Sequence, residues 1–142
     1  MSETDHTPRI PRRIGAVLAG LLAVVILSIA TDMTLHASAI FPPAGQPMVD
    51  ALWLLAAAYR TVYGAAGGYI AARLAPDRPM THALALGVIG LAMSIAGAVA
   101  AWNGGPAYGP KWFSLALIAI ALPSAWAGGR LLGAQLRARP AL

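Results

Sequence analysis

Four long stretches without a charged side chain constrain this 142-residue sequence more than any other feature. They cover residues 14–31, 51–59, 83–101 and 113–129. A helix needs about 20 mostly apolar residues to cross a bilayer core. Extended over their apolar flanks, the stretches predict transmembrane helices at residues 14–35, 49–74, 80–102 and 112–132.

The amount of charge in the chain agrees with lipid rather than water around these helices. Only 11% of the residues are charged, whereas a soluble domain carries about 25%. The segments are uniformly apolar, which differs from the alternation of membrane strands over about 10 residues. The sequence therefore predicts an all-α membrane protein, with an antiparallel bundle of four transmembrane helices in residues 14–133.

The basic residues predict how this bundle is oriented. Loops rich in Pro and Gly at 41–47, 75–79 and 103–110 separate the predicted helices. Arginines lie in the N-terminal tail (1–13), around the second loop, and in or just before the C-terminal tail (134–142), at Arg9, Arg12, Arg13, Arg73, Arg78, Arg130, Arg137 and Arg139. The other two loops and the residues beside them contain only Lys111. Because positive loops stay in the cytoplasm, we expect both termini there.

A secretory signal peptide is an alternative interpretation of the first apolar segment. Basic residues precede that segment and Ala37-Ser38-Ala39 follows it, as at a cleavage site. The segment is longer than the 7–15 apolar residues typical of such signals. We therefore expect a retained first helix.

Composition argues against several other classes of protein. The net charge is +5, but the basic residues lie at helix ends and form no face for nucleic acid. They favour anionic lipids instead. The chain has no cysteine and no hydrolase or phosphate-binding motif. We expect no catalytic residue, metal or cofactor, and His36 and His82 are too far apart in the predicted bundle to share one.

Small residues predict where the helices pack. Without a hydrophobic driving force between them, membrane helices associate through close backbone contact. The small residues at suitable spacing are Gly64, Gly67, Gly68, Gly90, Ser94, Gly97, Gly129 and Gly133. We expect contacts within the bundle, and an interface with a second copy or another membrane protein remains an alternative.

A few ionisable residues lie within or near the predicted spans. Asp32 and His36 share one helix face because they are four residues apart. Arg60 is near the middle of the second helix, with Tyr59 and Tyr63 beside it. Counted from the first loop, Asp32 and Arg60 differ in depth by only about 6 Å of helical rise. We therefore predict an ion pair between the first two helices.

This cluster leaves two classes of function open. As a charge pair that fixes the helix register, it suits a non-enzymatic structural, accessory or lipid-interacting membrane protein. As a proton relay or polar binding site, it suits a small oligomeric transporter or proton-coupled carrier. A dry, packed interior around Arg60 would favour the first class, and a water-filled pocket that reaches Arg60 from outside would favour the second.

Short motifs along most of the chain resemble an uncharacterised family of small four-helix bacterial inner-membrane proteins. They are Thr31-Asp32-x3-His36, Phe41-Pro42-Pro43, Tyr59-Arg60-x2-Tyr63-Gly64-x2-Gly67-Gly68-Tyr69, Ala72-Arg73-Leu74-Ala75-Pro76, Pro79-Met80-x-His82-Ala83, Gly105-Pro106 and Gly109-Pro110-x-Trp112. The resemblance implies a four-helix fold in the bacterial inner (plasma) membrane and implies no activity. Small multidrug transporters are similar in size only, because the first helix here lacks their membrane-embedded Glu.

Overall fold

The computed structural model describes residues 9–140, and this part of the chain is helical with no strand. Its helices are α1 (Arg9–Ala37), α2 (Asp50–Leu74), α3 (Pro79–Ala101), the short 3-10 helix η1 (Pro106–Tyr108) and α4 (Lys111–Ala138). The prediction of four long helices and an all-α fold is thus confirmed for the described residues.

The helices at the two ends of the chain are longer than the predicted spans. α1 begins at Arg9 and α4 continues to Ala138, so parts of both predicted tails are helical. The outermost parts of these tails, residues 1–8 and 141–142, lie outside the described residues. Helices can extend past the hydrocarbon core because their backbone hydrogen bonds are satisfied internally in either solvent.

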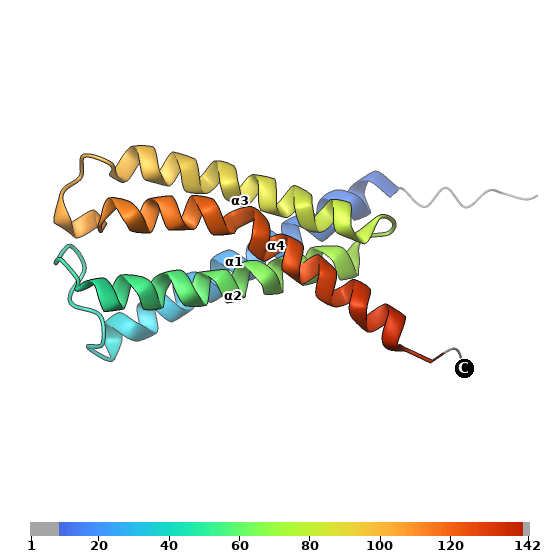
Figure 1. Cartoon of the computed structure of the whole chain (residues 1–142), viewed down its shortest axis with the longest axis horizontal. Coiled ribbons are helices and arrows are strands. Elements are labelled where there is room, and N and C mark those ends of the chain that lie inside the picture. Colours follow the sequence, from blue (N-terminus) through green and yellow to red (C-terminus); the bar gives the residue numbers. More distant parts are fainter. Residues whose placement is uncertain (1–8, 141–142) are drawn as a thin grey trace, which may run out of the picture.

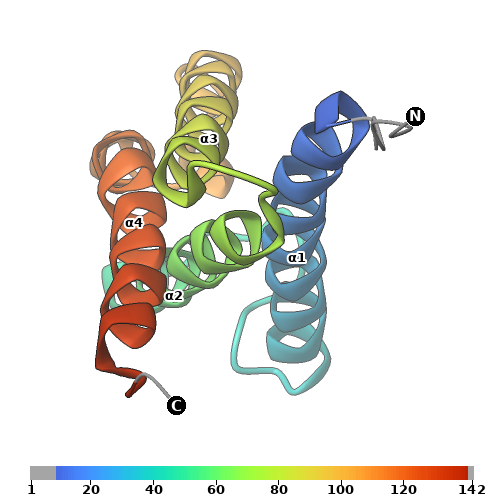
Figure 2. The same ribbon diagram turned by 90° about the vertical axis from the view of Figure 1, so that its right-hand side faces the viewer.

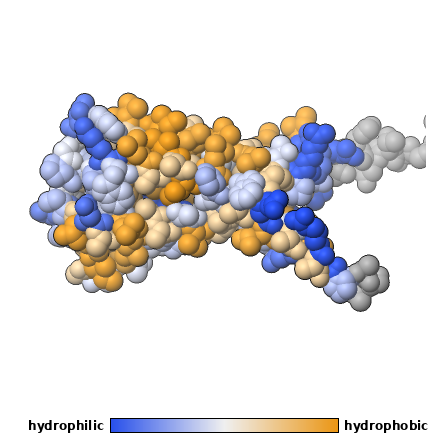
Figure 3. All heavy atoms as spheres, in the orientation of Figure 1, coloured by the Kyte–Doolittle hydropathy of each residue, from blue (hydrophilic) through white to orange (hydrophobic). Residues whose placement is uncertain are grey.

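Three of the helical segments are long and apolar enough to cross a membrane. They are α1, α3 and the stretch Pro106–Ala138 that contains α4. α2 is not among them, because it contains Arg60 and is rich in Ala, Gly and Tyr, which are less apolar than Leu, Ile and Val. Figure 3 shows hydrophobic residues over much of the middle of one face, with hydrophilic residues gathered toward the two ends.

The less apolar helix occupies the centre of the bundle. α2 packs against α1, α3 and α4 (Figures 1 and 2). α4 contains Pro123 and bends about halfway along its length in Figure 1, as expected where proline removes a helical hydrogen bond. α2 thus has protein on several sides, which lets it hold polar side chains.

Glycines in α2 allow its neighbours to approach at backbone distance. A Cβ added at Gly67 would lie 2.9 Å from the carbonyl oxygen of Gly20 in α1. One at Gly68 would lie 2.8 Å from Cα of Ala125 in α4, and one at Gly64 would lie 2.5 Å from Oγ of Ser124. No real side chain fits at such distances, so these three glycines are packing residues.

The remaining predicted packing residues behave differently. Gly129 packs against α3, because a Cβ there would lie 2.9 Å from Cβ of Ala83. Gly90 and Gly97 have nothing within 4 Å of an added Cβ, and at Gly133 only its own helix's Arg137 is near. Gly90, Gly97 and Gly133 therefore make no close contact with another helix of the bundle, contrary to the expectation. Ser94, one turn from Gly90, is only partly buried and lines a cavity described below.

Candidate functional site

The predicted ion pair is present between α1 and α2. Nη2 of Arg60 donates a hydrogen bond to Oδ2 of Asp32 over 2.6 Å. About 28% of the Arg60 side chain and 32% of the Asp32 side chain are exposed. Because both groups retain access to their surroundings, the pair borders open space instead of being sealed in a core.

Aromatic side chains hold the two charged groups in place. Tyr59 donates its hydroxyl proton to Oδ1 of Asp32, and Nη1 of Arg60 lies 3.3 Å from the same hydroxyl oxygen. The guanidinium carbon of Arg60 is 5.2 Å from the ring centroid of Tyr59 and 5.8 Å from that of Phe113 in α4. Cation–π attraction at these distances supplements the ion pair. The site thus joins α1, α2 and α4.

The other two predicted members lie near the carboxylate without bonding to it. The hydroxyls of Tyr63 and Thr31 are 2.7 Å apart and form a second polar contact between α1 and α2. Nδ1 of His36 lies 2.7 Å from the backbone oxygen of Asp32, and its ring packs edge-on against Phe41 at 5.4 Å. The structure therefore places His36 beside the site but shows no His–Asp side-chain relay.

The Asp32–Arg60 pair borders two cavities. The smaller one, of about 230 Å³, lies under the loop between α1 and α2 and includes His36 and Phe41 in its wall. The larger one, of about 470 Å³, lies among all four helices, and we call it the central cavity. Asp32 and Arg60 line both of them, so the ion pair belongs to the walls of both cavities.

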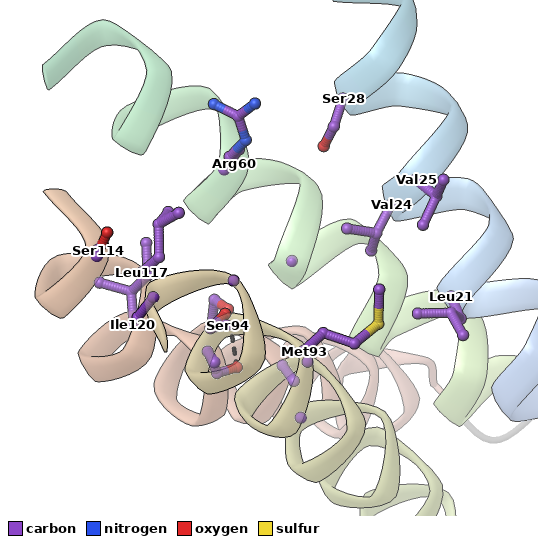
Figure 4. Close-up of a pocket in the computed structure, with 18 of the residues that line it drawn as sticks. Leu21, Val24, Val25, Ser28, Arg60, Met93, Ser94, Ser114, Leu117 and Ile120 are labelled. Atoms are coloured by element: carbon purple, nitrogen blue, oxygen red, sulfur yellow. Dashed lines mark hydrogen bonds between the residues drawn. The ribbon is translucent and has the colours of Figure 1, made fainter. Parts of the chain in front are cut away.

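The central cavity is an apolar groove with a charged end. Figure 4 shows Val24 and Ser28 of α1, Met93 of α3 and Leu117 of α4 around it, with Arg60 on α2. Apart from the ion pair, its polar side chains are hydroxyls, from Ser28, Ser94, Ser114, Ser124 and Tyr108. A hydrocarbon chain fits such walls, and the charged end suits a polar group attached to that chain.

Glycines on α3 leave this cavity open. Gly90 and Gly97 both line it, and an added Cβ at either position would enter empty space. Nearer the start of α3, Leu86 lies close to α1. A Cβ added at Gly20 of α1 would lie 3.1 Å from Cδ2 of Leu86. α3 thus borders an open space along Gly90 and Gly97 and makes a close contact with α1 nearer its start.

Sequence reasoning missed Phe113 as part of the site. Its ring is buried and packs on Trp53 at a centroid distance of 4.8 Å as well as near Arg60. An aromatic residue in the first turn of α4 gave no sign of a cationic neighbour, because that contact depends on how α4 sits against α2.

The described residues include no group of three or more metal-ligating side chains that could hold an ion. His36 lies in the last turn of α1. His82 lies in the first turn of α3, where its Nδ1 is 3.2 Å from the backbone oxygen of Arg78.

Comparisons of the chain with protein-family models, with curated proteins and with solved structures find no match. The site is therefore interpreted from its own geometry.

Proposed function

We propose that the chain is a polytopic protein of the bacterial inner membrane, with four membrane-crossing helices and both termini in the cytoplasm. The three strongly apolar segments support insertion. α2 lies between the neighbours that insert, and its Arg60 is paired with Asp32. An ion pair and protein contacts lower the cost of carrying a polar helix into lipid. The eight arginines at one side support the orientation.

Within that membrane, the protein acts as a non-enzymatic, lipid-interacting component that binds one amphipathic molecule in the central cavity. The observation that carries this proposal is an apolar space of about 470 Å³ that ends on the Asp32–Arg60 pair. This volume lies in the range of known small-molecule sites. The hydrocarbon part of the ligand lies along α1 and α3, and its polar head lies at the ion pair.

A purely structural role for the ion pair explains less of the geometry. A pair that only fixes helix register needs close packing around it, whereas Asp32 and Arg60 both border open cavities. No other helix lies close to Gly90 or Gly97, so helix packing within the bundle does not explain why these positions hold glycine. An amphiphile in the cavity gives a role to the open walls and to the charged end together.

Filling the cavity tests this function. We expect native mass spectrometry of the full chain in mild detergent to detect one bound single-chain lysophospholipid. The change Gly90→Leu places a side chain in the cavity and should abolish that complex. Gly15→Leu is the matched control, because Gly15 also has free space around an added Cβ but does not line the cavity. Equal binding by all three proteins would contradict the proposal.

A small oligomeric transporter or proton-coupled carrier is the second candidate. It is favoured by Asp32 and Arg60, which line both cavities. Opening of this pair would connect the loop cavity with the central cavity, and His36 and Tyr63 lie close by. A carrier predicts proton or solute flux in proteoliposomes that Asp32→Asn abolishes, whereas the lipid-binding function predicts no flux.

A further inference from the structure

A second groove lies between α1 and α3, at the end of the bundle opposite the Asp32–Arg60 pair. Its volume is about 490 Å³. α1 contributes Arg13, Ile14 and Leu18, α3 contributes Ile89, and the loop between α2 and α3 contributes Asp77 and Arg78. We call it the basic groove. None of its lining residues lines the central cavity.

The basic groove changes from charged to apolar along its length. The charged residues Arg13, Asp77 and Arg78 occupy one end, near the start of α1 and the start of α3. Leu18 and Ile89 lie farther along the same helices, with 49% and 36% of their surface exposed. A polar end followed by an apolar wall matches the headgroup and the acyl chain of a lipid.

The length of the groove corresponds to one leaflet. On α3 the lining extends from Thr81 to Ile89, which is about 12 Å at 1.5 Å per residue. Half of a hydrocarbon core about 30 Å thick is only slightly longer. An acyl chain that begins at Arg78 would therefore end near Ile89 at the bilayer midplane.

The charges at the polar end favour an anion. Asp77 accepts hydrogen bonds from Nε of Arg13 at 3.1 Å and from Nη2 of Arg13. Arg78 is exposed and forms no ion pair with any residue in 9–140. The polar end thus has one carboxylate and two guanidinium groups, so its net charge is positive. Arg9 adds a further positive charge one turn before Arg13.

We propose that the basic groove binds an anionic phospholipid, with its phosphate at Arg78 and an acyl chain along Ile14, Leu18 and Ile89. Basic pockets between transmembrane helices at the cytoplasmic side suit such headgroups. A second copy of the chain is a poorer occupant, since a two-fold interface at this groove would bring the Arg78 residues of both copies together. The inference does not depend on the ligand of the central cavity.

Photolabelling of the full chain in nanodiscs tests this site. The probes are phosphatidylglycerol and phosphatidylcholine, each with the same photoreactive acyl chain, and labelled residues are located by mass spectrometry. We expect α1 and α3 residues of the basic groove to be labelled several times more strongly by phosphatidylglycerol. Arg78→Gln should reduce that preference about fivefold, the effect of one basic residue at an anionic surface. A twentyfold or greater excess of inorganic phosphate should not compete with the lipid.

The matched control is Arg139→Gln, which removes an exposed arginine that does not line the groove. It should keep the full preference for phosphatidylglycerol. Equal labelling by both lipids, or the same loss in both variants, would overturn the site, because general surface attraction would then explain the result. Competition by inorganic phosphate, or a crosslinked dimer in place of labelled lipid, would overturn it as well.

Discussion

Arg60 of α2 donates to the carboxylate of Asp32 in α1 over 2.6 Å, and both side chains border two separate cavities. The pair therefore does two things at one place. It pairs two charges that would each be costly alone among apolar helices, and it gives the central cavity a polar end.

Breaking the pair should destabilise the bundle. Either Asp32→Asn or Arg60→Gln leaves one charged group without its partner, and we expect each to lower the free energy of unfolding by about 1–3 kcal/mol. The double variant should lose less than the sum of the two, with a coupling of about 0.5–3 kcal/mol. Unfolding in detergent micelles measures the cycle. Arg130→Gln, which removes a cation stacked on Trp126, should show no coupling to Asp32→Asn.

Enlarging a glycine in α2 should disrupt helix packing. Gly68→Val places carbon atoms inside the backbone contact with Ala125, and overpacking of this kind costs about 1–3 kcal/mol. Gly133→Val is the comparison, because space around Gly133 is limited only by Arg137 of the same helix. Thermal unfolding should separate the two variants, and equal melting temperatures would disprove the packing role of Gly68.

Single cysteines should label from opposite sides of the membrane at the two ends of α2. The chain has no native cysteine, so Ala44→Cys and Ala75→Cys each supply one thiol. We expect a membrane-impermeant maleimide to reach position 44 from the periplasm of intact cells and position 75 only after permeabilisation. Labelling of both from one side would show that α2 does not cross.

The ion pair at the other end of the molecule should make stability depend on pH. Hydrogen bonds from Arg13 lower the pKa of Asp77 below its usual 3.8. The folded state therefore favours the ionised form of Asp77 more than the unfolded state does. The stabilisation of the fold by this ion pair is present above pH 3.8 and is lost as the pH falls through the lowered pKa. Wild type should therefore exceed Asp77→Asn in melting temperature at pH 7, and the difference should shrink as the pH falls below 3.8 and through the lowered pKa. High salt should shrink the difference at pH 7, because the pair is exposed.

Local sequence rules predicted the helices and the contact between Asp32 and Arg60. Long uncharged stretches locate helices because lipid requires every backbone group to be bonded within its own segment. The ion pair followed from the rise per residue in two antiparallel helices around a short loop. Gly64, Gly67, Gly68 and Gly129 were likewise identified as packing residues from their small size.

The cavities and the part played by Phe113 could not be predicted in this way. Gly90, Ser94 and Gly97 have the spacing of a packing face, and only the direction of α3 relative to α1 decides whether another helix covers them. That direction depends on tertiary contacts at the far end of the helices, such as Leu86 against Gly20. Phe113 lies 53 positions from Arg60 in the sequence, so their contact also depends on tertiary packing.

The most direct test of lipid binding in the central cavity is a map of photolabelling by a single-chain amphiphile with a diazirine on its chain. Val24 and Met93 face the cavity, whereas Ile26 and Val99 are 61% and 74% exposed and do not line it. We predict that label concentrates at Val24 and Met93, and that Gly90→Leu removes it there while leaving any label at Ile26 and Val99. Uniform labelling of all four residues, unchanged by Gly90→Leu, would contradict a ligand site in this cavity.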